Sequence, residues 1–252
     1  RQSARCQLLL KRLGTVQDPT EEFGQLLGPQ VAGEDGRLAS KFTLQYFDSK
    51  SLPPSLMDWC QDLVKSHLYD LYMTVWGWSD EEKRKQLAAP QSKFIVAFAP
   101  EEAAPAPAGP SSTVEPADQV AGTSGQPQQA AQAAAGPGRP AAFVNFRFEP
   151  GYFGDPVLYV YEVMVEPRYQ RMGLGTRLLG LLEEVAWQYG MDQVILTEFT
   201  ANKAAASLYR KLGFARDKAS PSNKGYEILS KSKPGSSGQG QGGKAKSKSG
   251  KK

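Results

Sequence analysis

Hydrophobic and polar positions form their clearest pattern in the second half of the chain. Short runs rich in β-branched and aromatic residues alternate there with segments whose apolar residues recur at helical spacing. The predicted strands cover 142–148, 157–165, 193–199 and 225–230, and the predicted helices cover 174–189 and 202–212. Gly190 and Gly213 follow the two helices directly, as is common at helix C-termini.

The first half has a similar but less regular pattern. Alternation predicts a strand at 41–47, and a continuous apolar run predicts a buried strand at 93–99. Between these strands, a Pro-Pro pair precedes a segment with helical spacing that extends to Tyr72. Ser79 and Glu82 then form a capping-box pattern, which predicts a second, short helix. The first forty residues have only weak periodicity, and we assign no element to them.

The composition changes abruptly between Pro100 and about Pro140, where Ala, Pro, Gly, Gln and Ser predominate. Such a segment buries too little apolar surface to offset its ordering entropy, so we predict a disordered insertion at 100–140. Long surface insertions add little closure entropy, and the flanking strands therefore belong to one domain at 41–230. Residues 1–40 form an N-terminal segment, and 231–252 form a disordered lysine-rich tail.

The net charge of +4 over 252 residues conceals an asymmetry. Seven lysines and no acid follow Ser230, which leaves 23 basic and 26 acidic residues in the body. An acidic body favours a basic substrate, and a basic tail favours an anionic surface such as nucleic acid or the ribosome. The alternative for the tail is a disordered solubilising end.

Several classes of site are disfavoured by composition. Cys6 and Cys60 form no CxxC pair and no disulfide framework, so a reducing compartment is the expectation. His67 is the single histidine, which excludes a His-rich metal site, and we expect it to be an ordinary helix or surface residue. No apolar run approaches the roughly 18 residues that a membrane span needs.

The segment from Val160 to Glu184 carries the candidate chemistry. One carboxylate, Glu162, interrupts an apolar strand, and a turn containing Gly173 and Gly175 leads into a helix. The glycines let backbone N–H groups approach an anion at the helix N-terminus, which suits a pyrophosphate. A dinucleotide fingerprint is disfavoured because its third glycine is missing.

Strand alternation also predicts where the Glu162 side chain lies. The residue should share one face of the strand with Val160 and Met164, which would place its carboxylate at the rim of a cleft. The alternative is an acid that simply faces solvent.

Two motifs carry a resemblance to a known superfamily. The turn "QRMGLG" (170–175) matches the Q/R-x-x-G-x-G/A loop of the GCN5-related N-acetyltransferases (GNAT), and "NKAAASLYRKLGF" (202–214) matches their second signature. The resemblance implies an α/β GNAT fold, with a central mixed β-sheet flanked by helices. It further implies a splayed strand that forms a cleft for acetyl-CoA, the co-substrate, and no metal.

Further segments are similar to one branch of this superfamily, N-alpha-acetyltransferase D (NatD). They are "WGW" (76–78), "FRF" (146–148), "LYVYEVMVE" (158–166), "LTEF" followed by Asn202, and "SPS…YEILS" (220–230). That branch acetylates the N-terminal serine of core histones that begin Ser-Gly-Arg-Gly. The resemblance covers about 41–99 and 141–230. It implies histone tails as substrate, a cytoplasmic and nuclear location, and no membrane; we also expect a monomer.

The resemblance assigns roles to residues one by one. Glu162 takes the position of the general base, with Tyr161 beside it. The residues implied to bind acetyl-CoA are Val163, Met164, Val165, Arg171, Met172, Gly173, Leu174, Gly175, Thr176 and Asn202. Those implied to bind the peptide are Tyr72, Glu149, Tyr161, Thr197, Ser220 and Tyr226. Tyr209 fits the position of the superfamily's acid, although the NatD branch has phenylalanine there.

The identity of the accepting amine stays open. A free α-amine has a pKa of roughly 7.7–8.0 and needs only about 1 kcal/mol to deprotonate near pH 7, whereas a lysine at about 10.4 needs nearer 4.6. One carboxylate acting through water suits the α-amine. The alternatives are a GNAT enzyme for lysine, a polyamine or another N-terminus, and a non-catalytic module that binds histone tails or ribosomes. The histone-like segment 237–249 is either a pseudosubstrate or a low-complexity coincidence, and the latter is favoured.

Overall fold

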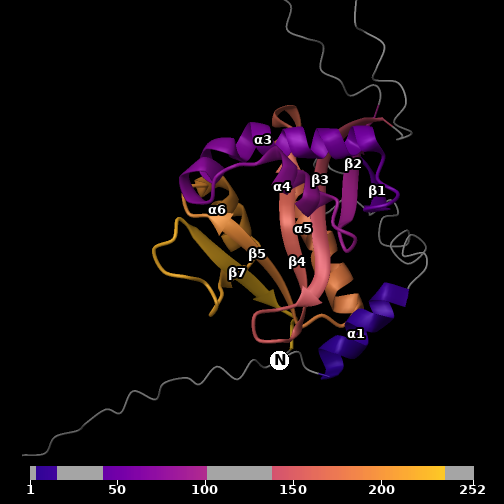
Figure 1. Cartoon of the computed structure of the whole chain (residues 1–252), viewed down its shortest axis with the longest axis vertical. Coiled ribbons are helices and arrows are strands. Elements are labelled where there is room, and N and C mark those ends of the chain that lie inside the picture. The colour runs from indigo at the N-terminus through magenta and orange to yellow at the C-terminus, as the bar shows by residue number, and fades with distance from the viewer. Residues whose placement is uncertain (1–3, 16–41, 101–137, 236–252) are drawn as a thin grey trace, which may run out of the picture.

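The computed structural model of the protein describes residues 4–15, 42–100 and 138–235, and every structural statement below concerns these ranges. Within them, seven strands form one mixed sheet in the order β1-β2-β3-β4-β5-β7-β6 (Figure 1). The strands are β1 (Thr43–Asp48), β2 (Lys93–Ala99), β3 (Arg139–Pro150), β4 (Pro156–Val165), β5 (Gln193–Phe199), β6 (Ala215–Arg216) and β7 (Tyr226–Ser232). Only β4 and β5 pair in parallel; the other neighbouring strands are antiparallel.

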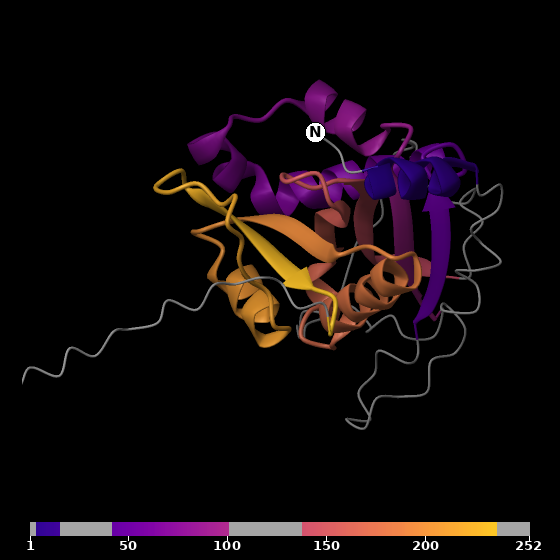
Figure 2. The same cartoon turned by 90° about the horizontal axis from the view of Figure 1, so that it is seen from below.

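Helices cover both faces of the sheet (Figure 2). One face carries α3 (Pro54–Val75) and α4 (Asp80–Leu87), and the other carries α5 (Leu174–Gln188) and α6 (Lys203–Lys211). A short 3-10 turn (Pro167–Tyr169) links β4 to the segment before α5. Each face has its own apolar core. One is built around the leucines of α5, and the other around α3 with Phe94, Phe98 and Phe143 of β2 and β3. The predicted α/β architecture, with a mixed sheet flanked by helices, is confirmed.

Local sequence signals determine the ends of several helices. The Ser79 hydroxyl accepts a hydrogen bond from the Glu82 backbone N–H at 3.2 Å, as the capping-box pattern predicted. Asn202 caps α6 in the same way through the N–H of Ala205. Gly190 and Gly213 adopt φ values of 75° and 85° beyond α5 and α6, a region that glycine occupies without steric cost.

A helix near the N-terminus was not predicted from the sequence. It is α1 (Ala4–Thr15), whose Leu9 and Leu13 pack against the core beneath α5. Arg5 holds the helix in place, because its guanidinium donates to both carboxylate oxygens of Asp192 at 2.8 and 2.9 Å. These contacts join positions more than 180 residues apart, so a local sequence pattern does not reveal them.

Parts of the three segments at 1–40, 100–140 and 231–252 lie outside the described residues, including all of 237–249. The strands on either side of the central insertion, β2 and β3, pair in antiparallel register from Lys93↔Phe146 to Ala99↔Arg139. They therefore form the two arms of a hairpin, as the sequence predicted.

Strand β4 loses one neighbour halfway along its length. Its pairing with β5 covers only Val157↔Gln193 to Val160↔Leu196, although β4 continues to Val165 and β5 to Phe199. Beyond this point the two strands diverge, while β3 continues to pair with β4 up to Val165. The divergence is the splayed strand that the sequence analysis predicted.

A β-bulge in β4 changes the side on which its residues lie. Asn145 pairs with Glu162 but its neighbour Phe146 pairs with Val160, so Tyr161 is an extra residue in the strand. Val160 packs into the core beneath α5, whereas Met164 packs into the core beneath α3. The expectation that Glu162 shares a face with Val160 is therefore wrong, because simple alternation does not anticipate the bulge. The shared face with Met164 is correct.

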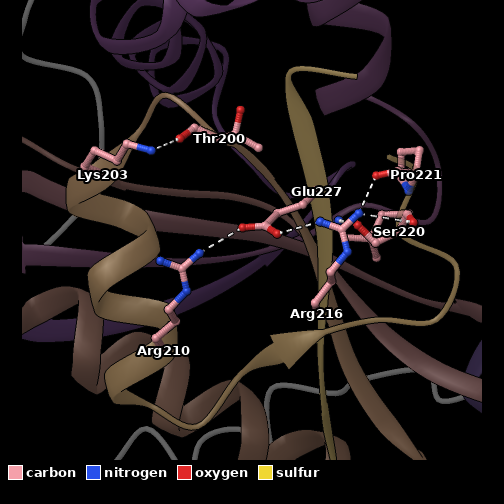
Figure 3. A network of polar contacts seen from close by, with 8 residues as sticks. Thr200, Lys203, Arg210, Arg216, Ser220, Pro221 and Glu227 are labelled. Carbon is pink, nitrogen blue, oxygen red and sulfur yellow. Dashed lines mark hydrogen bonds and ion pairs between the residues drawn. The ribbon is translucent and has the colours of Figure 1, made fainter. Parts of the chain in front are cut away.

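Two acids face each other across β5 and β7. Glu198 and Glu227 occupy paired positions, and both side chains are buried. Glu227 accepts hydrogen bonds from Arg210 at 3.0 Å and Arg216 at 3.1 Å (Figure 3). Among the described residues, by contrast, neither buried carboxylate oxygen of Glu198 has a hydrogen-bond partner. Burial, and then the neighbouring Glu227, raise the pKa of Glu198 to about 7. Glu198 is thus largely protonated in mildly acidic solution.

This pair predicts a pH-dependent stability. The pKa of Glu198 is about 7 in the folded protein and roughly 4.3 in an unfolded chain. The folded state therefore holds an extra proton between these values, and that stabilisation is present below about pH 4.3 and is lost as the pH rises through 7. Glu198→Gln mimics the protonated acid, so the free energy of unfolding of the variant relative to wild type should increase by about 2 kcal/mol between pH 5 and pH 8.

Urea unfolding at the two pH values measures this difference. Glu184→Gln, at an exposed acid of α5, is the control, and its difference from wild type should not depend on pH. If the difference in unfolding free energy between Glu198→Gln and wild type were also independent of pH, the raised pKa of Glu198 would be contradicted.

Candidate active site

A cavity of about 1000 Å³ lies where β4 and β5 diverge. It brings together most of the residues that the sequence singled out. The predicted residues that line it are Tyr72, Tyr161, Glu162, Val163, Met164, Val165, Arg171, Gly173, Leu174, Gly175, Thr176, Thr197, Asn202 and Tyr226. Glu149, Met172 and Ser220 are not among the lining residues. One cavity thus joins the acid and the glycine turn, the two features of the segment from Val160 to Glu184.

Glu162 is buried rather than solvent-facing, with 5 % of its surface exposed. Its Oε1 atom accepts a hydrogen bond from the Lys83 ammonium at 2.7 Å, and the Tyr72 hydroxyl lies 3.5 Å from the same oxygen. Lys83 and Glu162 form an ion pair whose two side chains are each 4 % exposed. Among the described residues, no hydrogen bond is recorded to Oε2, which leaves that oxygen for a molecule in the cavity.

Tyr161 lies beside Glu162 because of the bulge. Its ring packs against Tyr159 at 4.9 Å and against the Arg147 guanidinium at 4.1 Å, and its hydroxyl donates to Glu149 at 3.2 Å. Glu149 is therefore behind Tyr161, and its effect on a ligand passes through that phenol. Burial raises the pKa of Glu149, with the Tyr161 hydrogen bond opposing the shift.

The other end of the cavity is formed by the glycine turn. Arg171 and Gly173 both have left-handed backbones, with φ values of 64° and 87°. Gly173 is the N-cap of α5, and no side chain caps this helix. Its first N–H groups are therefore available to an anion at the positive end of the helix dipole. The turn from Arg171 to Thr176 thus has the backbone geometry of an anion site, and its role in binding acetyl-CoA stays a prediction. Met172 differs from its neighbours, because its side chain packs against the core.

The two glycines of the turn, Gly173 and Gly175, are required for different structural reasons. Gly173 supplies a left-handed backbone, whereas a Cβ at Gly175 would lie 3.2 Å from Leu208 of α6. Gly175 therefore allows α5 and α6 to approach closely. Asn202, at the start of α6, lines the cavity and also caps the helix, so its side-chain oxygen is already engaged.

Aromatic side chains surround the mouth of the cavity. The Trp76 ring contacts Phe199 at 4.8 Å and Tyr226 at 4.9 Å, and Tyr72 contacts Phe199 at 5.0 Å. Trp76 is 49 % exposed, and it is the largest exposed side chain among the lining residues. Tyr72 and Tyr226, which were predicted to enclose the peptide pocket, lie in this cluster together with the first tryptophan of "WGW".

Two further predicted contacts have different surroundings. The Thr197 hydroxyl lines the cavity and lies 2.6 Å from the Tyr159 hydroxyl. Ser220 is engaged in the backbone instead, because its Oγ accepts the N–H of Ile228, and the adjoining Pro221 carbonyl accepts from Arg216 (Figure 3). Ser220 therefore lies in the loop network beside β7 rather than on the wall of the cavity.

Tyr209, the residue at the superfamily's acid position, is buried and lines the cavity. Burial, with the charges of Glu198 and Glu162 nearby, raises the pKa of this phenol. It is therefore a neutral hydroxyl that can donate a proton or a hydrogen bond. His67 is a half-buried residue of α3 at the cavity wall, 3.4 Å from the Gln170 amide.

Sequence reasoning missed Lys83 and Glu198, the residues that most affect charge in and around the cavity. Lys83 lies in a highly charged helix, "DEEKRKQL", whose other lysine, Lys85, is exposed. The available signal was position, because Lys83 and Leu87 are four residues apart and are the two buried residues of α4. The sequence does not indicate that their shared face covers Glu162.

The described ranges hold neither a metal-binding cluster nor a membrane-spanning helix. No group of three or more His, Cys, Asp or Glu side chains is arranged to hold a metal there. No helix in those ranges has the length and apolar character needed to cross a membrane.

Comparison with known proteins gives partial similarities to acetyltransferases. N-alpha-acetyltransferase 30 of Xenopus laevis is 37 % identical over 60 residues, which is 24 % of this chain and 22 % of that protein. Thialysine N-epsilon-acetyltransferase of Sus scrofa is also 37 % identical over 60 residues, 24 % of this chain and 35 % of that protein. The chain thus spans about a fifth to a third of the length of these curated relatives.

A solved structure of Arabidopsis thaliana Naa50 with the bisubstrate analogue CoA-Ac-MVNAL is 15 % identical. The match covers 75 % of this chain and 99 % of the Naa50 chain, with a TM-score of 0.45. The family model described as "Acetyltransferase (GNAT) family" matches residues 65–214, which is more than half of the chain and includes the divergent strands, the glycine turn and α6. The chain therefore belongs to the GNAT acetyltransferase family.

Proposed function

We propose that the protein transfers an acetyl group from acetyl-CoA to the N-terminal α-amino group of a protein. The observation that carries the proposal is the cavity between β4 and β5, which joins the Glu162 carboxylate to the uncapped N-terminus of α5. A pyrophosphate fits the turn at Arg171 to Thr176, and the thioester would supply the acetyl group. The amine enters past the aromatic mouth, attacks the thioester carbonyl carbon and gives its proton to Glu162, directly or through water. The new C–N bond replaces the C–S bond, and coenzyme A leaves as a thiolate, which can take up a proton from the neutral Tyr209 hydroxyl or from water.

Direct attack by the amine agrees with the surroundings of the cysteines. Cys6 and Cys60 are both buried, and burial raises the pKa of the Cys60 thiol well above its usual range. A thiol held in its neutral form is a poor nucleophile. Neither cysteine lines the cavity, so an acetyl-cysteine intermediate has no support from the geometry.

We further propose the NatD specificity for the N-terminal serine of histones that begin Ser-Gly-Arg-Gly. The support is the resemblance of "WGW" and the strand segments, together with the mouth formed by Tyr72, Trp76 and Tyr226. The same proposal includes four further points: histone tails as partners, a ribosome contact through the lysine-rich tail, a cytoplasmic and nuclear location, and a monomeric state.

A second candidate function is acetylation of a side-chain or small-molecule amine. The observation that favours it is the similarity to thialysine N-epsilon-acetyltransferase, which equals the similarity to N-alpha-acetyltransferase 30 in identity and length. The GNAT turn does not separate the two functions, because it would hold the same acetyl donor in both.

Peptides with free and blocked N-termini distinguish these functions. The peptide Ser-Gly-Arg-Gly-Lys should be acetylated when its α-amine is free and should show no turnover when that amine is blocked. Mass spectrometry of the product should place the acetyl group on the N-terminal serine. Equal turnover of both peptides, or a label on lysine, would instead support the second candidate.

Replacement of the proposed base should reduce chemistry more than binding. Glu162→Gln keeps the shape of the side chain but removes proton acceptance, so kcat should fall by about 10²- to 10⁴-fold. The variant also leaves the Lys83 charge unpaired, which costs about 3–5 kcal/mol of stability. Activity is therefore compared at a temperature where circular dichroism shows the variant folded. Glu184→Gln is the control, and an unchanged kcat for Glu162→Gln would remove Glu162 as the base.

The backbone of the glycine turn should matter for the acetyl donor. Gly173→Ala places a Cβ on a left-handed residue at a cost of about 1–2 kcal/mol, so the KM for acetyl-CoA should rise roughly 5- to 30-fold if the turn distorts to relieve it. The peptide KM should change little. Gly180→Ala lies in open space in α5 and is the matched control. An equal effect of both substitutions would contradict a specific role for the turn.

A further inference from the structure

The ammonium of Lys83 is completely engaged inside the protein. It donates to the Tyr72 hydroxyl at 2.6 Å, to Gln86 Oε1 at 2.6 Å and to Glu162 Oε1 at 2.7 Å. A lysine ammonium has three N–H donors, and these three acceptors use all of them. The ammonium also lies 4.5 Å from the centre of the Tyr72 ring and 6.0 Å from that of Trp78. Lys83 therefore has one fixed position.

That position is behind the carboxylate and not in the cavity. Glu162 and Gln86 line the cavity, whereas Lys83 does not. Lys83 is therefore not placed to touch a substrate, and it acts on the cavity through Glu162. Because it approaches Oε1, it fixes the plane of the carboxylate and leaves Oε2 toward the cavity.

The pair also determines the local charge. Titratable groups face Glu162 from three elements: Lys83 from α4, Tyr72 and Cys60 from α3, and Tyr209 from α6. Burial and the negative charge of Glu162 raise the pKa values of Tyr72, Cys60 and Tyr209, so these groups stay neutral. Lys83 is thus the group of this set that brings a positive charge to the Glu162 carboxylate, at 2.7 Å from Oε1.

We propose that Lys83 is a positioning residue, which orients the Glu162 carboxylate and keeps it ionised. The resulting ion pair is a weak base, and it selects substrates whose amine is itself weakly basic. A carboxylate already neutralised by an ammonium attracts a second ammonium poorly. It therefore suits an amine that is largely neutral near pH 7, such as a protein α-amine with a pKa of roughly 7.7–8.0, better than a lysine near 10.4. The selectivity part rests on the proposed function, whereas the effect on Glu162 does not.

The effect on Glu162 is tested without any substrate. Carbon-13 NMR of glutamate carboxylates follows the titration of Glu162, whose signal is identified by its loss in Glu162→Gln. In Lys83→Met and Lys83→Gln the midpoint should rise by about 1–3 pH units relative to wild type, because an opposite charge within 4–6 Å shifts a carboxyl by this amount. Lys83→Gln is included because its amide can still donate to Tyr72 and Glu162 if Lys83→Met does not fold.

Two further variants separate charge from structure. Lys83→Arg keeps the charge, so its midpoint should stay near the wild-type value, even if altered geometry lowers kcat. Lys85→Met removes an exposed lysine of the same helix, whose partners are Glu81 and Glu82, and should change neither quantity. An unchanged midpoint in both neutral Lys83 variants would overturn the proposal.

The selectivity is tested on the same proteins with two peptides. One has a free N-terminus and no lysine, and the other has a blocked N-terminus and one lysine. In Lys83→Gln, the acid limb of the pH profile of kcat/KM for the first peptide should move to higher pH. The kcat/KM for the first peptide divided by the kcat/KM for the second peptide should also fall at least threefold. If the ratio is the same in wild type and Lys83→Gln, the selectivity part of the proposal is overturned. The positioning role is judged separately, from the NMR midpoint. Failure of wild type on the first peptide would overturn the proposed function alone.

Discussion

The loss of one neighbour by β4 is the constraint on which the site depends. β3 pairs with β4 along its length, but β5 leaves it after Val160, where Leu196 is the last partner. The next five residues of β4 therefore have one edge without a strand. Backbone groups at such an edge must find other partners, and an extended ligand can supply them. Both the cavity and its backbone wall thus follow from one change in strand direction.

The Tyr161 bulge adds the chemistry to this geometry. In a regular strand of the same sequence, Glu162 would lie on the same face as Val160 and point into the apolar core beneath α5. With the bulge at Tyr161, Glu162 instead faces α3 and α4, where Tyr72 and Lys83 meet the carboxylate. Bulges often redirect side chains near active sites. Here, the bulge places the acid beside its ammonium partner and not in the apolar core.

The sequence predicted the elements better than the site because local signals determine the elements. The Ser79 cap, the glycines after α5 and α6, and the apolar periods each act within a few residues, and the structure confirms them. Lys83 and Glu162, by contrast, meet across 79 positions, and Arg5 and Asp192 across 187. Neither contact follows from spacing. The exchange of faces at the bulge was also hidden, because alternation assumes a regular strand.

The two buried acids near Tyr209 show how the environment separates similar groups. Glu162 faces the Lys83 ammonium at 2.7 Å. Glu198 lines the same cavity but faces the carboxylate of Glu227, and burial with that neighbour raises its pKa to about 7. Two carboxylates of one cavity thus have unlike neighbours, an ammonium for Glu162 and a second acid for Glu198. This difference in neighbours is the physical reason for assigning proton acceptance to Glu162 in the proposed reaction and not to Glu198.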